Sequence, residues 1–412
     1  MKKLGFQIPP ALHSRPFLLY WSGQLISIAG SQMQLWALYW HIRTLTAEPI
    51  ALGAVGVVRF LPVLVFSLLG GLVADQFNRR SIVLITQTTL MLIAGVLGLL
   101  TWMGTIQLWH IYLLVGIQAF ATSFDGPARA ALIPNLVTRE DLPNAFSMTS
   151  LAQNVGAIIG PLFSGIVIAA LGQQWTYWIN AISFLAVLIS LWMIGEIPQS
   201  QVIHIGNNWL QWSTIREGIQ YIITQPIILS SMILDFFATF FSSANTLLPF
   251  VARDVLNVGA VEYGWLSAAQ SVGSVAVALY ISQNTRIRRQ GVVLLSAVGM
   301  FGVGTILFGA STSFWLTMLS LVVVGGSDTI STILRNTIRQ LITPDKMRGR
   351  MTSINQIFFM GGPQLGEIES GLVAQAFGVP AAIISGGVGC ILAVTAITWR
   401  WPQLRQYEGV KS

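Results

Sequence analysis

Long apolar segments alternate with short polar ones along the chain. Of its 412 residues, 54% are hydrophobic and only 9% are charged, whereas soluble domains carry about 25% charged residues. The segments reach the roughly 20 residues that a helix needs to cross a bilayer, and no short alternating strands of a membrane barrel occur. The pattern predicts an all-α membrane protein with twelve transmembrane helices. They are expected at about 17–40, 50–74, 81–104, 107–132, 144–171, 175–196, 227–250, 260–283, 291–311, 314–338, 350–376 and 379–400.

The positive charges distinguish the two sides of the membrane. With the amino terminus placed inside, 19 of the 22 Lys and Arg residues fall on the inner side. Only Arg43 and Arg253 fall outside, and Arg59 lies within a span. Because cytoplasmic loops are enriched in Lys and Arg, we expect both termini to be cytoplasmic. Topology then explains the formal net charge of +7, and no nucleic-acid partner is expected.

One long polar stretch divides the chain. It predicts an amino-terminal six-helix half at residues 1–197, a cytoplasmic linker at 198–226 and a carboxy-terminal six-helix half at 227–412. Within the linker, Trp209–Tyr221 has the composition of an amphipathic helix lying on the inner surface.

The two halves share a pattern of charges. Asp125 and Arg129 in the fourth span are matched by Asp328 and Arg335 in the tenth, at an offset of about 205 residues. Transporters with parallel repeats bind their cargo near mid-membrane at the repeat interface. The repeat therefore predicts two pseudo-symmetric six-helix halves, and any cargo site is expected between them.

Charged residues inside membrane spans are costly and usually face a cavity or a partner. Apart from Glu196 and Arg400 at the last positions of their spans, none lies within the third, sixth, ninth or twelfth span. The remaining spans supply the candidates for a substrate or proton pathway, which are Gln24, Ser31, Arg59, Asp235, Asp328, Arg335, Glu367 and Glu369. The protonatable ones are the four acids. Each acid has an alternative interpretation as a buried structural ion pair, for example with Arg59, Arg129 or Arg335.

Polar residues also recur at helical spacing on the first, fourth, seventh and tenth spans. The stripes are Gln24, Ser27, Ser31 and Gln34; Gln118, Thr122, Asp125 and Arg129; Asp235, Thr239, Ser242 and Thr246; and Asp328, Ser331, Arg335 and Arg339. Any one hydroxyl can simply bond helix to helix, but four stripes favour a cavity lining. Phe236, Phe237, Phe240 and Phe241 follow Asp235, and would suit a bulky, partly aromatic solute if they face inward.

The turn between the second and third spans carries an acid and two arginines. It resembles the loop motif G-x-L-A-D-x-x-G-R-[KR] of the major facilitator superfamily. The matching residues are Gly71, Ala74, Asp75, Arg79 and Arg80, while Val73 and Asn78 depart from the motif. The resemblance implies a gating network in which these charges pair with Asp125 and Arg129 and latch the halves in one state. The alternative is a set of topology anchors.

The fifth span contains a second motif. Gly156, Gly160, Pro161 and Gly165 resemble the helix-5 motif of exporters, G-x-x-x-G-P-x-x-G-G, with Ser164 in place of one glycine. The resemblance implies a bent helix packed tightly against the other half, and favours export over uptake. Ordinary small-residue packing is the alternative.

Further stretches narrow the resemblance to one branch. Phe17–Gln24, Ala51–Gly53, Phe60–Val63, Asp125–Arg129 and Asn180–Phe184 are similar to the enterobactin-exporter and macrolide-efflux branch, the drug:H⁺ antiporter-3 or transmembrane secretion effectors. The likeness runs from about residue 14 to about residue 400. It implies a monomeric secondary transporter in the bacterial inner membrane that exports a siderophore, macrolide-like drug or other secondary metabolite. It also implies proton antiport and alternating access.

Two features limit this interpretation. The uncharged stretch Leu113–Gln118 stands where many drug-proton antiporters carry an arginine, so proton coupling by that route is not expected. A nutrient importer on the same fold and a non-transporting membrane sensor remain as alternatives.

Enzymatic chemistry has no sequence support. The chain has no P-loop, no catalytic triad grouping and no metal-ligand spacing. Its single Cys390 excludes a disulfide framework, and no cleavage site follows the basic start, so no signal peptide is expected. We therefore expect no enzyme activity, no metal and no cofactor.

Overall fold

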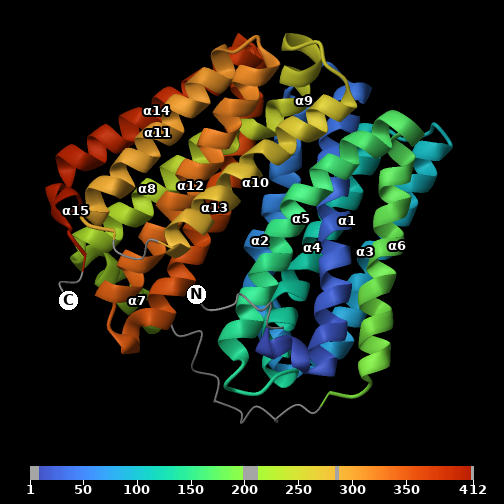
Figure 1. The fold of residues 1–412 in the computed structure, drawn as a ribbon, viewed down its shortest axis with the longest axis horizontal. Helices are drawn as coiled ribbons and strands as arrows, with labels where there is room; N and C mark the ends of the chain where they lie inside the picture. Colours follow the sequence, from blue (N-terminus) through green and yellow to red (C-terminus); the bar gives the residue numbers. More distant parts are fainter. Residues whose placement is uncertain (1–8, 198–211, 284–286, 410–412) are drawn as a thin grey trace, which may run out of the picture. The chain divides into compact units, whose positions relative to one another are not determined.

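The computed structural model describes residues 9–197, 212–283 and 287–409. Within these ranges all regular structure is helical (Figure 1). By their contacts the residues form two compact units, Met1–His41 with Val58–Ile203, and Ile42–Val57 with His204–Ser412. We call them unit 1 and unit 2. The sequence-based halves, 1–197 and 227–412, stay a prediction.

Six long helices make up the amino-terminal set. They are α1 (Arg15–Leu45), α2 (Ile50–Gln76), α3 (Arg79–Trp102), α4 (Leu108–Leu132), α5 (Leu142–Leu171) and α6 (Gln173–Ile194). Their bounds lie within a few residues of the predicted spans. Short connections hold them together: the Asn78 side chain caps α3 by accepting from the Ser81 N–H at 3.2 Å. Gly172, with φ +94°, makes the turn from α5 to α6.

The carboxy-terminal set begins with α7 (Trp212–Thr224), which lies within the predicted linker. Next comes α8 (Pro226–Ser242), which continues through three short helical segments to Val255. The remaining helices are α10 (Ala260–Gln283), α11 (Gln290–Ala310), α12 (Phe314–Ile342), α13 (Asp345–Phe377), α14 (Val379–Arg400) and the short α15 (Pro402–Gln406).

The seventh span is not the single regular helix that was predicted for 227–250. The α-helix ends at Ser242 and passes into a 3₁₀ segment (Ser243–Leu247), one α-turn (Leu248–Phe250) and a π-helical turn (Val251–Val255). Pro249 explains part of the break, because it lacks an N–H and clashes with the preceding turn. Asn245 in this segment donates to Gln270 of α10 at 2.8 Å.

Composition supports a membrane-spanning chain. Among the described residues, eight helices are long and apolar enough to cross a membrane, and α2 contains a shorter apolar stretch, Ile50–Phe66. With α1, α4 and α13, they complete the twelve expected spans.

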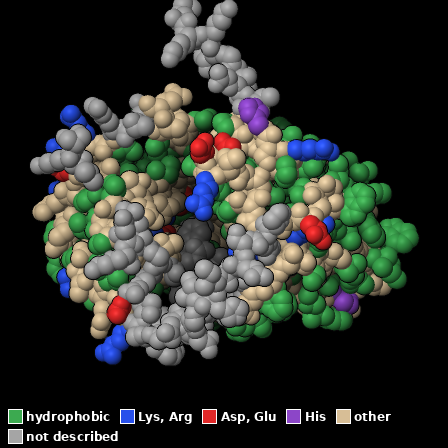
Figure 2. All heavy atoms as spheres, turned by 90° about the horizontal axis from the view of Figure 1, so that it is seen from below, with side chains coloured by type: hydrophobic (Ala, Val, Ile, Leu, Met, Phe, Trp, Pro, Cys, Tyr) green, Lys and Arg blue, Asp and Glu red, His purple; other side chains and the backbone are tan. Residues whose placement is uncertain are grey.

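Large apolar side chains are exposed on the helices that correspond to the uncharged spans. Ile85 on α3, Trp192 on α6, Met300 on α11 and Trp399 on α14 each expose more than half of their surface. Figure 2 shows charged side chains spread over one end of the molecule and apolar ones covering much of the flank. Such apolar surface is suited to lipid.

The glycine motif of α5 packs differently from the prediction. It was expected to contact the other half, but a Cβ atom at Gly156 would lie 2.5 Å from the Ile28 side chain of α1, within unit 1. Gly160 likewise faces Gln32 and Met33 of α1. Pro161 and Gly165 are buried in the same helix. The motif therefore brings two helices of one unit close together.

The same arrangement recurs in unit 2. Gly362 of α13 lies against Thr239 of α8, and Gly366 lies against the Phe240 carbonyl of α8. The fifth and eleventh spans thus use glycines to approach the first and seventh. This correspondence is structural evidence for the pseudo-symmetry of the two six-helix sets.

The segment Ile42–Val57 belongs to unit 2. Arg43 forms a two-pronged ion pair with Asp254, at 3.0 and 2.5 Å, and lies over the Phe250 ring. Gly53 approaches Gly371 of α13, since a Cβ atom there would lie 3.2 Å from the Gly371 Cα. The end of α1 and the start of α2 are thereby attached to α13 and to the segment after α8.

Candidate functional site

A buried polar cluster in unit 1 is centred on Asp125 of α4. Its Oδ1 accepts from Thr86 at 2.6 Å and from Gln87 at 3.1 Å, both on α3. Its Oδ2 lies 2.5 Å from Nε of Arg129, one turn further along α4. One acid thus meets one arginine and two neutral donors, so both carboxylate oxygens are occupied.

Tyr20 and Gln24 of α1 extend this cluster. Both are buried, and Gln24 donates to the Tyr20 hydroxyl at 2.8 Å. Tyr20 also lies close enough to Asp125 and Arg129 to interact with their charges. Three helices of unit 1 therefore contribute polar groups to one place.

The arginines of the loop motif bind helix ends. Arg79 donates to the carbonyls of Ala74 on α2 and Ala131 on α4, at 3.3 and 3.0 Å. Arg80 donates twice to the Leu191 carbonyl on α6, at 3.1 and 3.0 Å. Carbonyls in the last turn of a helix lack intrahelical partners and carry the negative end of the helix dipole.

These contacts differ from the predicted pairing of Arg79 and Arg80 with Asp125. A helix C-terminus offers several unpaired acceptors beside the loop, whereas Asp125 already has partners. Gly71 and the Asp75 side chain lie outside what the structure describes. The latch involving Asp75 consequently stays a prediction.

A second buried cluster, in unit 2, joins α8 to α12. Asp235 of α8 is 2% exposed, and its two oxygens each contact an arginine of α12 at 3.0 Å. Oδ1 meets Nη2 of Arg335, and Oδ2 meets Nη2 of Arg339. One carboxylate therefore serves two guanidinium groups that are themselves almost wholly buried.

Arg339 has a full set of acceptors. Its Nε donates to the Ser231 hydroxyl at 3.1 Å, and its Nη2 donates to the Ser231 carbonyl at 2.9 Å as well as to Asp235. Nη1 donates to Asn355 of α13 at 2.5 Å. All three nitrogens are thus bonded, and α8, α12 and α13 are tied together.

Arg335 is only partly satisfied. Besides Asp235, its Nη2 donates to Thr332 at 3.0 Å and lies 4.0 Å from Asp328. Its Nε and Nη1 have no hydrogen-bond partner in the described structure. The Asp328 side chain is 42% exposed, so this end of the cluster reaches open space.

The other predicted residues lie apart from these clusters. Arg59 donates to the Tyr39 hydroxyl at 3.1 Å, and Ser31 is half-buried. In unit 2, Glu367 is buried beside Gly56, where a Cβ atom would come within 3.1 Å of its Oε2. Glu369 is half-buried on the same helix. The two clusters therefore unite only some of the candidates.

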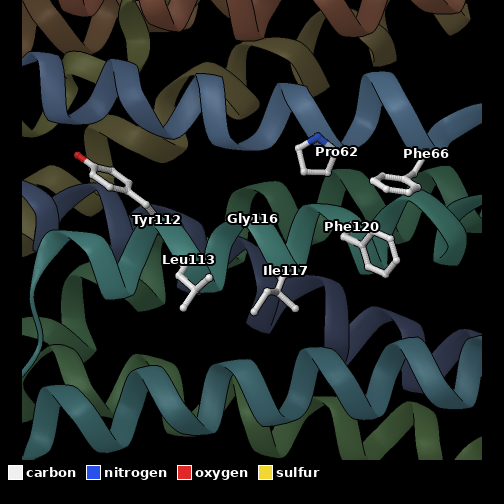
Figure 3. A pocket seen from close by; sticks show the side chains of 7 residues that line it. All are labelled: Pro62, Phe66, Tyr112, Leu113, Gly116, Ile117 and Phe120. Carbon is white, nitrogen blue, oxygen red and sulfur yellow. The ribbon is translucent and has the colours of Figure 1, made fainter.

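An apolar groove in unit 1 runs between α2 and α4 (Figure 3). It measures about 360 Å³ and is lined by Pro62 and Phe66 of α2 together with Tyr112, Leu113, Gly116, Ile117 and Phe120 of α4. The uncharged stretch noted in the fourth span forms one wall of this groove. Within the described ranges, no group of three or more His, Cys, Asp or Glu residues could hold a metal ion.

Sequence reasoning missed several members of both clusters. Thr86 and Gln87 stand in the third span, which supplied no candidates because it carries no charged residue. The available signal was that these two polar residues are adjacent within an apolar segment. Arg339 was placed on the polar stripe of its span without a role. Nothing in the local sequence marked Ser231 or Asn355, since both act through contacts between helices.

The chain is similar in sequence to a family of membrane proteins and to named bacterial exporters. A model of the transmembrane secretion effector family matches residues 9–411. The enterobactin exporter EntS of Shigella boydii serotype 18 (strain CDC 3083-94 / BS512) is 28% identical over 345 residues, covering 83% of this chain and 81% of the exporter. The protein of the same name from Salmonella choleraesuis (strain SC-B67) is 28% identical over 324 residues, covering 77% and 76%.

Solved structures share the fold at low sequence identity. A bacterial homologue of the human lysosomal transporter Spinster aligns with a TM-score of 0.75 at 15% identity, over 98% of this chain and all of that one (100%). The nucleoside transporter NupG aligns with a TM-score of 0.74 at 15% identity, over 95% and 100%. The predicted major facilitator fold is thereby confirmed, and the chain is a multi-pass inner-membrane protein. It belongs to the transmembrane secretion effector family of the major facilitator superfamily.

Proposed function

We propose that this chain is a secondary active exporter that moves a small molecule out of the bacterial cytoplasm. The similarity to enterobactin exporters over 83% of the chain carries the proposal. Buried charges on α4, α8 and α12 support it, because a membrane protein retains such costly groups chiefly where they serve a pathway or a switch. The candidate cargoes are siderophores, macrolide-like drugs and other secondary metabolites, and the transporter acts as a monomer with both termini in the cytoplasm.

The two clusters have different roles in this proposal. Arg79 and Arg80 hold the ends of α2, α4 and α6 together, which supports movement of unit 1 as one body. Asp125 and Arg129 lie next to this joint and, with Gly71 and Asp75, form the gating network of an alternating-access cycle. For the cargo or proton pathway, unit 1 contributes Gln24, Ser31 and Arg59, and unit 2 contributes the Asp235 cluster.

Proton antiport is the proposed energy source. Asp235, Asp328, Glu367 and Glu369 are the carboxyl groups that can take up a proton within the spans. Protonation of Asp328 would remove a charge 4.0 Å from Arg335, and protonation of Asp235 would weaken the link between α8 and α12. Either event changes the balance of a charge cluster, which is how a proton can drive a conformational change.

Everted membrane vesicles test the direction and the coupling. Vesicles that contain the protein should accumulate iron-free enterobactin when respiration acidifies their interior, and nigericin, which collapses the pH gradient, should abolish accumulation. Vesicles with an Asp235→Asn, Asp328→Asn double variant are the matched control. Accumulation only in right-side-out vesicles would indicate an importer, and binding without flux would indicate a sensor.

Cysteine labelling tests the orientation. In a Cys390→Ser background, a cysteine at Gln201 should resist an impermeant maleimide in intact cells, whereas one at Thr105, in a predicted outer loop, should react. The reverse pattern would show that the termini face outward.

A further inference from the structure

The two free nitrogens of Arg335 are the most unusual feature of unit 2. Among the residues that the structure describes, neither Nε nor Nη1 has an acceptor, although Arg335 is only 1% exposed. A buried donor without a partner loses its bonds to water and gains none, and the loss is largest for a charged group. Buried polar groups in native proteins normally have hydrogen-bond partners, so two unpaired donors indicate a position where an acceptor binds.

The charges around Arg335 indicate what that acceptor is. Arg335 and Arg339 are both buried, but Asp235 is the one buried acid in contact with them. Asp328 lies at 4.0 Å, the outer limit of an ion pair, and its side chain is 42% exposed. Among the fully buried groups, two guanidinium groups therefore face one carboxylate, and an anion would supply a closer counter-charge than the half-exposed Asp328 does.

Access and shape come from neighbouring residues. Asp328 lies two helical turns before Arg335 on the same face of α12, and its exposed carboxylate marks the side from which a ligand can approach. Phe236 and Phe240 follow Asp235 on α8, are stacked with ring centroids 5.9 Å apart and are half-buried. These two rings belong to the same helix as Asp235, the acid that contacts Arg335.

We propose that Arg335 is the anion-binding residue of the cargo site, accepting a carboxylate or ionised phenol through its Nε and Nη1 donors. The proposal rests on the exporter function above and names its substrate class as organic anions with an aromatic or apolar body. A guanidinium group suits this task, because its donors are fixed in a plane that matches a carboxylate. An amine-bearing drug would meet unfavourable charge at the same position.

Matched acid and amide probes test this by binding alone, so the result does not depend on transport. The purified protein in lipid nanodiscs is titrated calorimetrically with 2-naphthoate and with 2-naphthamide, which share the ring system and differ in charge. The wild-type protein should prefer the acid by about tenfold or more, as expected for hydrogen bonds to a charged group. Arg335→Gln should abolish the preference, and Arg335→Lys, which keeps the charge and loses the planar fork, should reduce it severalfold.

Arg43→Lys is the matched control. It makes the same change in another Arg–Asp pair of unit 2 and should leave the preference unchanged. Equal binding of both probes, no binding of the acid, or a preference that survives Arg335→Gln would overturn the proposal. The titrations are run with gluconate as the buffer anion and repeated with chloride. If the preference for the acid disappears in chloride, the site takes an inorganic ion, and the proposal is overturned.

The outcomes separate the two proposals. If the acid preference is present and depends on Arg335 while everted vesicles export nothing, the anion site stands and the exporter function fails. If vesicles export enterobactin and the probes are bound equally, the exporter function stands and the role of Arg335 is wrong. Should Arg335→Gln fail to fold, Arg335→Lys decides the question by itself.

Discussion

The Asp125 and Asp235 clusters each centre on one buried acid, and they differ in where the arginine partners of that acid lie. In unit 1, Asp125 pairs with Arg129 on its own helix and receives two neutral donors from α3. In unit 2, Asp235 bridges from α8 to two arginines of α12, and one of these keeps free donors. Among the described residues, buried atoms without a hydrogen-bond partner occur in both clusters, Gln87 Oε1 and Arg129 Nε in unit 1 and Arg335 Nε and Nη1 in unit 2. What distinguishes the second cluster is that one buried acid serves two buried guanidinium groups on another helix.

The largest difference is expected when each acid is neutralised. Asp235→Asn leaves two buried guanidinium groups without a buried acid, with only the half-exposed Asp328 near Arg335, and breaking a buried pair costs about 3–5 kcal/mol. Asp125→Asn removes one charge beside a less buried arginine and retains a side-chain oxygen for Thr86 or Gln87, so we expect about 1–3 kcal/mol. Thermal unfolding in detergent compares the two, with Asp328→Asn as the exposed control. Equal losses of stability in Asp235→Asn and Asp125→Asn would mean that the two acids contribute equally to the stability of their units.

A smaller difference is expected at the glycine contacts of the two units. In Gly366→Ala the new methyl group would overlap the Phe240 backbone carbonyl, whereas in Gly156→Ala it meets the Ile28 side chain, which can shift. We expect Gly366→Ala to cost about 1–3 kcal/mol and Gly156→Ala clearly less. Gly299→Ala, with nothing within 4 Å, is the control and should be neutral or stabilising. A larger loss of stability in Gly156→Ala than in Gly366→Ala would contradict the prediction that the backbone contact at Gly366 is the less adaptable one.

The smallest effect is expected at the ion pair of Arg43 and Asp254. Its acid is 40% exposed, and exposed pairs contribute about 0–1 kcal/mol. Asp254→Asn should therefore shift thermal stability little, and the shift should shrink further in high salt. A loss as large as that of Asp235→Asn would show that exposure does not distinguish these two pairs of unit 2.

Much of the fold followed from the sequence, because helix length in lipid is set by apolar run length. Helix α10 spans Ala260–Gln283, as predicted, and α14 begins and ends within a residue or so of expectation. The break after Ser242 was not predicted, since it depends on Pro249 and on contacts with α10. Local pattern thus fixes where helices lie, and tertiary contacts decide where one is interrupted.

The site was less predictable than the fold. An ion pair of Asp235 with Arg335 was one of several pairings left open, and the choice among them depends on the packing of α8 against α12, which periodicity does not specify. Arg79 and Arg80 were assigned to a charge network, whereas they bind backbone carbonyls, and backbone acceptors leave no trace in the sequence. Charge type was therefore readable from the chain, and partner choice was not.

The unpaired donors of Arg335 also bear on the energetics of transport. If Arg335 carries an anion, each export cycle moves negative charge from a cytoplasm held at negative electrical potential to the outside. That movement is worth about 2.3 kcal/mol per charge for every 100 mV, in the direction of export. Transport would then be electrogenic, and the membrane voltage itself would help to empty the cell of its cargo.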